Sequence, residues 1–346
     1  MQIIINAGGT GTRLWPFSTS NRPKQFVPLI DEESFLTKTY NRLISFFPKE
    51  SIWINTNIKF VDQVSDCLPT DFPKDHILTE PQKKDTFAAI ISHAAIVSHF
   101  TSNSESLLFI HADHLIQEQD WLEFNKGLER IAESLKRKEF EIITAAIKPT
   151  FPNTMLGYIQ IAGDEVSKSF VKPVKVSAFK EKPDLETASE FLESGNYLWN
   201  LGYFSLTFDS LLAIMHRLYP ELVDPLLAIQ SDGKITVENY EKFPKVAVDY
   251  AIAEKIESLG VLGMDISWED VGSWEIAKQY LPALAENKNH IQIGGENNKV
   301  KLTNQNRKVA FVGVSDLMLV ESEEGILVIN PKFSAEVKKV AEYFEK

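Results

Sequence analysis

The chain has 346 residues, of which 44% are hydrophobic, so it can bury a large core and hold one α/β domain with a small extension. Its 48 acidic and 36 basic residues give a formal charge of −12, which argues against non-specific binding to nucleic acid or to an anionic membrane. An anionic ligand would therefore have to be held by a few local cations.

Cysteine content and hydropathy bear on the compartment. Cys67 is the single cysteine, so an intramolecular disulfide is impossible and a reducing cytosol is the natural environment. The first residues run into a strand without a basic segment or a cleavage site, and no apolar run approaches the ~20 residues that a membrane span needs. We expect a cytoplasmic protein with no membrane contact.

A glycine-rich loop follows the first predicted strand. The isoleucines at 3–5 indicate a short buried strand, and residues 7–13 continue Ala-Gly-Gly-Thr-Gly-Thr-Arg. Glycines let the backbone turn sharply and bring bare N–H groups close to a ligand, as phosphate binding requires. The third glycine of a dinucleotide fingerprint and the Gly-Lys-Ser/Thr of a P-loop are both missing. Arg13 and Lys24 supply cations that suit a polyphosphate, although a glycine turn with solvated basic residues is the alternative.

Strand and helix patterns then alternate. Short apolar runs predict strands, and apolar residues at helical spacing predict the helices between them. The strand runs are 52–55, 76–79, 107–110, 142–147, 174–179 and 261–264, and the helical segments are 33–47, 58–68, 88–99, 117–135, 184–194 and 206–229. This alternation predicts an α/β fold with a Rossmann-like, mostly parallel twisted sheet flanked by helices.

An acidic residue stands where one of these strands ends. Asp113 follows the run 107–110, and open α/β sheets bind ligands at the carboxyl ends of their strands, so Asp113 is a candidate magnesium ligand. A helix cap is the alternative for Asp113. His111 and His114 invite a zinc interpretation, but no further Cys/His spacing completes such a site, and structural histidines are the better interpretation.

The loop and the later motifs, taken together and in order, resemble the sugar-1-phosphate nucleotidylyltransferases. Residues 7–16 with Pro23-Lys24-Gln25-Phe26 look like the family signature, in the form typical of mannose-1-phosphate guanylyltransferases. Similar segments lie at 80–86, 111–114, 157–160, 179–183, 199–204, 248–254 and 268–274. The resemblance therefore covers nearly the whole chain and implies a nucleotidyltransferase fold similar to that of GT-A proteins.

The resemblance assigns nucleotide binding to the glycine loop and to the segment after residue 79. The nucleotide-binding residues that it implies are Ala7, Gly8, Gly9, Gly11, Thr12, Glu80 and Thr86. A carboxylate at Glu80 can accept hydrogen bonds from the N1–H and amino group of guanine. Asp85 or Thr86 also suits the N-cap of the following helix, and capping alone is the alternative.

On the sugar side, the resemblance places Lys182 at the sugar phosphate and Gly157, Glu181 and Asn200 at the hexose. The alternative for Gly157 is a structural role, in which glycine relieves a bend in a strand. Departures from the family pattern occur at His111, Gln160, Leu201 and Tyr203. The sequence fits Asp249 equally well as the N-cap of a helix and as a residue that faces the ligand.

The metal and catalytic sets also follow from the resemblance. Asp270, in the segment 268–274, matches the family's other metal ligand, so Asp113 and Asp270 together would hold Mg²⁺, with a structural turn as the alternative for Asp270. The catalytic set that the resemblance implies is Arg13, Lys24, Asp113, Lys182 and Asp270.

The implied reaction is attack of mannose 1-phosphate on the α-phosphorus of GTP, which gives GDP-mannose and pyrophosphate. A phosphate monoester, with a second pKa of about 6, is already ionised at neutral pH, so no catalytic base is required. Three alternatives stay open. They are another nucleotide or hexose 1-phosphate, a catalytically silent relative that binds nucleotide sugar, and a nucleotide-sugar dehydrogenase, which would need the missing glycine.

The sequence pattern changes after Pro282. Short β-like runs at 309–312, 317–320 and 326–329 precede a predicted helix at 334–344. We therefore divide the chain into a catalytic domain, 1–285, and a small C-terminal β domain with a closing helix, 286–346. This appendage is too short for the cupin-like isomerase domain of some relatives, and no hexapeptide repeat is long enough for an extended β-helix. The sequence leaves open whether it covers an edge or supports a homodimer.

Overall fold

A computed structural model of the chain describes residues 1–9, 11–282, 284 and 288–345. Its large sheet has the strand order β3-β2-β1-β4-β10-β6-β11-β8. The strands that run in one direction are β1 (Gln2–Asn6), β2 (Ile52–Asn57), β3 (Ile77–Glu80), β4 (Ser106–His111), β6 (Ile142–Ile147) and β11 (Leu259–Gly263). Between β4 and β6, β10 (Tyr197–Thr207) runs the opposite way. The predicted α/β class with a mostly parallel sheet is confirmed.

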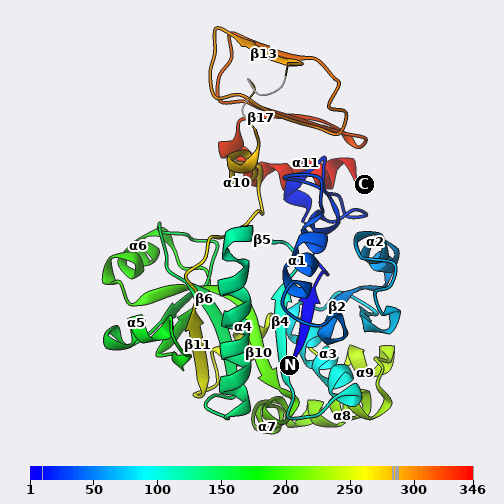
Figure 1. The fold of residues 1–346 in the computed structure, drawn as a ribbon, viewed down its shortest axis with the longest axis vertical. Coiled ribbons are helices and arrows are strands. Elements are labelled where there is room, and N and C mark those ends of the chain that lie inside the picture. The colour runs from blue at the N-terminus through cyan, green and yellow to red at the C-terminus, as the bar shows by residue number, and fades with distance from the viewer. Residues whose placement is uncertain (10, 283, 285–287, 346) are drawn as a thin grey trace.

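Helices cover both faces of this sheet (Figure 1). Ile3 and Ile5 of β1 lie in a core with one set of helices, whereas Ile4 lies in a core with another. The first set is α1 (Phe35–Ile44), α2 (Val61–Cys67), α4 (Trp121–Lys136) and α6 (Leu185–Ser194), and the second is α3 (Thr86–Phe100), α7 (Phe208–Leu218) and α8 (Val223–Asp232). Because both faces are buried, the strands are continuous apolar runs.

The region after β6 contains shorter strands. The single strand predicted for residues 174–179 is wrong, because the chain changes partner there: β8 (Val174–Lys175) pairs with β11, and β9 (Ala178–Lys180) pairs with β7 (Tyr158–Gln160). A separate ribbon joins β5 (His114–Ile116) to β12 (Trp268–Asp270). Within the described part of the chain, no helix is long and apolar enough to span a membrane.

The C-terminal strands form two stacked coils at one end of the molecule's long axis (Figure 1). β13 (His290–Ile293) is parallel to β15 (Val309–Val312), and β14 (Lys299–Leu302) is parallel to β16 (Met318–Ser322), with an offset of 19 residues in both pairs. β17 (Gly325–Ile329) adds an antiparallel strand. α10 (Trp274–Ala277) and α11 (Val337–Phe344) lie between these coils and the large sheet.

Two features of the coils bear on the sequence predictions. Gly294 and Gly313, and likewise Asn297 and Asp316, occupy matching left-handed corners with φ between 57° and 67°. Among the described residues these corners occur in two successive coils, which agrees with the lack of a long repeat pattern in the sequence. The predicted domain boundary, between residues 285 and 286, lies outside the described residues.

Candidate functional site

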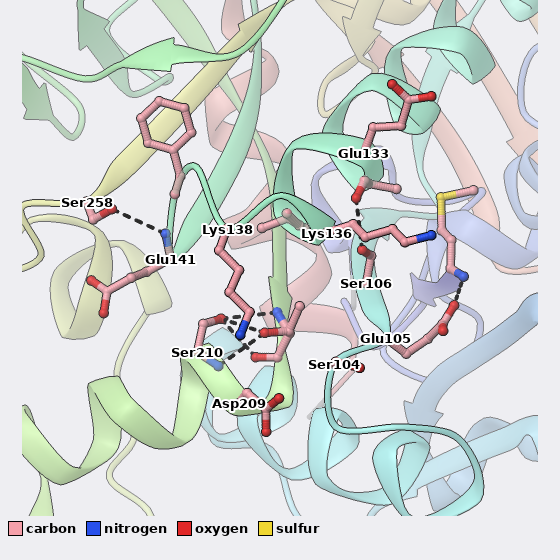
Figure 2. Close-up of a pocket in the computed structure, with 15 residues that line it drawn as sticks. Ser104, Glu105, Ser106, Glu133, Lys136, Lys138, Glu141, Asp209, Ser210 and Ser258 are labelled. Atoms are coloured by element: carbon pink, nitrogen blue, oxygen red, sulfur yellow. Dashed lines mark hydrogen bonds and ion pairs between the residues drawn. The ribbon is translucent and has the colours of Figure 1, made fainter.

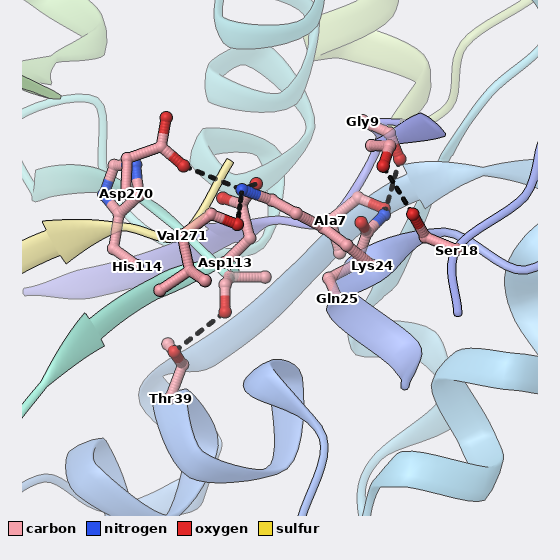
Figure 3. Close-up of polar contacts among 12 residues, drawn as sticks. Ala7, Gly9, Ser18, Lys24, Gln25, Thr39, Asp113, His114, Asp270 and Val271 are labelled. Carbon is pink, nitrogen blue, oxygen red and sulfur yellow. Dashed lines mark hydrogen bonds and ion pairs between the residues drawn. The ribbon is translucent and has the colours of Figure 1, made fainter. Parts of the chain in front are cut away.

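The centre of the candidate site is a cluster in which one ammonium contacts two carboxylates (Figure 3). Lys24 Nζ lies 2.9 Å from Oδ2 of Asp113 and 2.7 Å from Oδ1 of Asp270. Asp113 lies in the turn between β4 and β5, and Asp270 ends β12. The pairing of β5 with β12 puts Asp270 opposite His114, so two distant segments meet. The capping alternative for Asp113 is wrong, because Asp120 occupies the N-cap position of α4.

The charges in this cluster stabilise one another. Burial alone would lower the pKa of Lys24, but the negative charges of Asp113 and Asp270 outweigh it and hold that pKa above its ordinary value. Burial alone would raise the pKa of both carboxyl groups, and the Lys24 ammonium instead holds them below the usual range. The Lys24 side chain is only 6% exposed, whereas that of Asp270 is 44% exposed. The cluster is therefore ionised at neutral pH and accessible on one side.

The glycine loop fits closely around Lys24. Gly11 has a φ of 60°, and a Cβ there would lie 2.8 Å from Cγ of Lys24, so both conformation and space require glycine. The side-chain amide of Gln25 donates to the carbonyls of Ala7 and Gly9, each at 2.8 Å, which fixes the start of the loop to the turn Lys24–Phe26.

Arg13 and Thr12 lie on the turn that follows. They belong to a 3-10 turn, Thr12–Leu14. Arg13 is exposed and forms no hydrogen bond or ion pair with any residue that the structure describes. Its guanidinium is therefore available to a ligand.

A cavity of about 200 Å³ opens beside the loop, at the carboxyl ends of β1 to β4. Of the predicted residues, those that line it are Gly8, Gly9, Glu80, Thr86 and Asp113. Asn6, Gln25 and Asn55 also line it and were not predicted, although polar residues at strand ends were a usable signal for Asn6 and Asn55. Oε1 of Gln25 and Oδ1 of Asn55 are buried acceptors without a hydrogen-bond partner among the described residues. The cavity is thus lined largely by polar side chains.

Glu80 is the charged acceptor in this cavity. Its carboxylate is buried, and the Tyr240 hydroxyl, from α9 (Val237–Glu241), donates to its Oε2 at 2.5 Å. Burial raises the pKa of Glu80, while hydrogen bonds from Tyr240 and Asn55 act in the opposite direction. No local pattern links Tyr240 to Glu80, so the sequence could not reveal this contact.

Asp85, in the loop between β3 and α3, caps a helix, as predicted. The Asp85 side chain accepts a hydrogen bond from the Thr86 backbone at the start of α3. The Thr86 hydroxyl accepts from the backbone N–H of Val248 at 2.9 Å. This hydrogen bond therefore connects the start of α3 to the segment that contains Asp249.

The predicted sugar residues form a second cluster. The Asn200 backbone donates to the Gly157 carbonyl at 2.8 Å, and a Cβ on Gly157 would collide with Oε2 of Glu181. Lys182 Nζ lies 2.8 Å from Oε1 of Glu181, and Lys182 has a left-handed φ of 46°, which is uncommon for a residue with a side chain. A side chain at position 157 would therefore displace the Glu181 carboxylate from this position.

Asp249 belongs to the same cluster. Asn200 Nδ2 donates to its Oδ1 at 3.2 Å, and Thr144 fixes the amide by donating to Asn200 Oδ1 at 2.8 Å. The N-cap interpretation of Asp249 is wrong, because Val248 occupies that position before a π-helix, Asp249–Ala253. Burial and the charge of Glu181 raise the pKa of Asp249 to about 6.

β10 connects the two clusters, and two of the departures from the family pattern, Leu201 and Tyr203, lie in it. Leu201 is buried in the core, Gly202 faces His111, and the Tyr203 hydroxyl is hydrogen-bonded to Nδ1 of His114 at 2.9 Å. Burial, followed by the charge of His111, lowers the pKa of His114 to about 3. The described residues contain no group of three or more His, Cys, Asp or Glu placed to hold a metal ion.

A larger cavity, of about 610 Å³, lies at the opposite ends of the strands (Figure 2). Met1, Ser106 and Thr207 line it, at the amino ends of β1 and β4 and the carboxyl end of β10. None of the predicted site residues lines this cavity. Open α/β sheets bind ligands at the other edge, so the smaller cavity is the candidate site.

The fold and this site are those of an α/β enzyme with a polar cavity at the carboxyl edge of its sheet. Residues 2–286 match the family model described as nucleotidyl transferase. The chain belongs to the nucleotidyl transferase family and is an enzyme of that class, as the sequence resemblance indicated.

Relatives and solved structures agree with this assignment. Mannose-1-phosphate guanylyltransferase of Escherichia coli is 32% identical, over 99% of this chain and 74% of the relative, and a putative enzyme of that name from Vibrio cholerae is 31% identical over the same shares. The crystal structure titled mannose-1-phosphate geranyltransferase, from Thermus thermophilus, superposes with a TM-score of 0.82 at 26% identity, covering 100% of this chain and 99% of that one.

We predict that Asp249→Asn stabilises the protein at neutral pH. The folded state raises the pKa of Asp249 to about 6 from 3.8, so folding favours the protonated form. The stability that the protonated carboxyl group contributes is present below pH 3.8 and is lost as the pH rises through 6. Asparagine stays neutral and can still accept from Asn200. Thermal unfolding should show a higher Tm for the variant at pH 7.5, with a smaller difference at pH 4.5. The exposed control Asp232→Asn should show no such trend, and a variant that is less stable at pH 7.5 than at pH 4.5, relative to wild type, would contradict the assignment.

Proposed function

We propose that this enzyme transfers GMP from GTP to mannose 1-phosphate, releasing pyrophosphate and forming GDP-mannose. The observation that carries the proposal is the contact of Lys24 with both Asp113 and Asp270, next to the glycine loop and the polar cavity. The relatives named mannose-1-phosphate guanylyltransferase support the choice of substrates.

On the nucleotide side, the backbone N–H groups of the loop and the free guanidinium of Arg13 bind the triphosphate. Glu80 accepts hydrogen bonds from the donor edge of guanine, and Thr86 places the start of α3 beside the nucleotide. Arg13 and Lys24 neutralise the charge that develops toward pyrophosphate. The structure supports these roles because Arg13 is unpaired among the described residues and Glu80 lines the cavity.

The two carboxylates fit a magnesium ion. Mg²⁺ binds hard oxygen ligands, commonly one or two carboxylates together with waters and substrate phosphates. Asp113 and Asp270 are ionised, lie within reach of one ammonium, and are open on the side of Asp270. When bound there, the ion would neutralise charge on the substrate phosphates. Lys24 holds the two carboxylates together.

On the sugar side, Lys182 binds the phosphate of mannose 1-phosphate, and Glu181 and Asn200 bind hydroxyl groups of the hexose. Repulsion between two anions opposes the reaction, so catalysis consists of orienting the attacking phosphate and compensating its charge. The nucleophile needs no base because it is ionised at neutral pH, with a second pKa of about 6.

Release of pyrophosphate tests the proposal directly. Purified protein should release pyrophosphate when it is given GTP, Mg²⁺ and mannose 1-phosphate together, and the other product should be GDP-mannose. Separate assays with ATP, UTP and CTP, and with glucose, galactose and fucose 1-phosphates, test the choice of substrates. Faster turnover with another pair would reassign the substrates, and nucleotide-sugar binding without any turnover would indicate a silent regulatory relative.

We predict that Lys182→Ala weakens binding of the sugar phosphate more than that of GTP. The loss of one charge-assisted hydrogen bond, worth roughly 1.5–3 kcal/mol, should raise KM for mannose 1-phosphate about ten- to a hundredfold. Steady-state kinetics with each substrate varied in turn provides the measurement. Lys172→Ala, an exposed lysine outside both clusters, is the control. Equal increases in both KM values would remove Lys182 from its assigned role.

We also predict that Tyr240→Phe reduces the preference for GTP over ITP, which lacks the 2-amino group of guanine. Loss of the Tyr240 donor raises the pKa of Glu80, so its carboxylate is lost at a higher pH as the solution is acidified. The ratio of kcat/KM values for the two nucleotides should fall about tenfold, and more at pH 6 than at pH 8. Tyr219→Phe, which loses a hydrogen bond to Ala251 instead, is the matched control. An unchanged ratio would exclude Glu80 from reading the base.

A further inference from the structure

The C-terminal segment packs against both halves of the candidate catalytic centre. The residues that follow Arg13 and the residues that follow Asp270 share one hydrophobic core with the C-terminal strands and helix. Its members include Leu14, Trp15, Phe17, Val271, Trp274, Met318, Val320, Leu327, Ile329, Val337 and Ala341. This core is separate from the two cores that cover the large sheet.

Trp15 is the centre of these contacts. Its ring stacks on Phe344 of α11, with centroids 5.3 Å apart and planes 15° apart. A Cβ on Gly325 would lie 3.0 Å from the same indole, so the backbone of β17 meets the ring directly. Nε1 of Trp274 donates to the Trp15 carbonyl at 2.9 Å. Trp15 is thus fixed by residues from three later parts of the chain.

Hydrogen bonds fasten the backbone on either side. Ser322 Oγ donates to the Pro16 carbonyl at 2.7 Å, and Oε1 of Glu345 accepts from the Ser20 backbone at 2.9 Å. Near Asp270, Ser334 Oγ accepts from the Glu275 backbone at 2.9 Å. The C-terminal segment therefore holds the loop both by apolar packing and by polar contacts.

These contacts matter for Arg13 because its side chain has no partner among the described residues. The position of Arg13 is set by its backbone, and the next two residues, Leu14 and Trp15, lie in the shared core. Val271, whose carbonyl accepts from Lys24 at 3.4 Å, lies in the same core. Movement of the C-terminal segment would therefore shift Arg13 relative to Lys24 and Asp270.

We propose that Phe344 and Glu345 are positioning residues, which hold the Thr12–Ser20 segment so that Arg13 reaches the triphosphate. The proposal rests on the proposed function for its kinetic consequence. Its physical content, an ordered loop that depends on α11, does not.

Two alanine variants of equal surface exposure test this physical content. Phe344 and Phe333 are each 63% exposed and both lie in the C-terminal segment, but only Phe344 stacks on Trp15. The amides of Leu14, Trp15, Phe17 and Ser18 donate to backbone carbonyls of the loop. Hydrogen exchange should become about tenfold faster at these amides in Phe344→Ala and stay unchanged in Phe333→Ala. Equal exchange in both variants would overturn the proposal.

Kinetics tests the consequence for the reaction. In Phe344→Ala, KM for GTP should rise about two- to tenfold, the scale expected for loss of one aromatic stacking contact, while KM for mannose 1-phosphate changes little. Phe344→Tyr should restore the wild-type value. If Phe344→Ala fails to fold, Glu345→Ala replaces it, with the exposed Glu342→Ala as its control, and should raise the same KM by two- to fivefold.

The outcomes separate this inference from the proposed function. A wild-type protein that releases no pyrophosphate contradicts the function, whereas the hydrogen-exchange result still decides whether α11 orders the loop. Faster exchange without any change in KM for GTP, in an active enzyme, contradicts the positioning role. A loss of affinity for both substrates, or one that Phe344→Tyr fails to restore, contradicts it as well.

Discussion

The site depends on one buried ammonium that brings two carboxylates together. Lys24 comes from the N-terminal loop, Asp113 from the end of the fourth strand, and Asp270 from the short ribbon formed by β5 and β12. A buried charge is tolerated only when it is paired, and here each partner keeps the other ionised. Gly11 leaves the space that the Lys24 side chain occupies. The conformation of the glycine loop and the charge balance of Lys24, Asp113 and Asp270 therefore depend on each other.

The two polar clusters are related through β10. Asn200 of this strand belongs to the cluster around Glu181 and Asp249, and Tyr203 is hydrogen-bonded to His114, the neighbour of Asp113. β10 lies in the middle of the covered sheet, and its register against β6 shifts between Asn200 and Phe204. One strand therefore links the two clusters, which suits a reaction in which two anionic groups must be held in fixed relative positions.

Much of the fold and site could be predicted because its signals are local. The apolar runs give the strands, and Lys24, Asp113, Glu181 and Asp270 each stand in a short recognisable segment at a strand or loop end. Tyr240 could not be predicted, since its bond to Glu80 joins segments with no pattern in common. The shared core around Trp15 was missed for the same reason, and the partner change at Val176 and Ser177 depends on which strands are nearby.

A crystal structure with bound GTP and Mn²⁺, which replaces Mg²⁺ and scatters anomalously, tests the central claim most directly. We expect an anomalous peak for a manganese ion coordinated by Asp113 and Asp270, with Arg13 in contact with the triphosphate. A metal peak away from these two carboxylates, or a triphosphate bound with Arg13 directed into solvent, would contradict it.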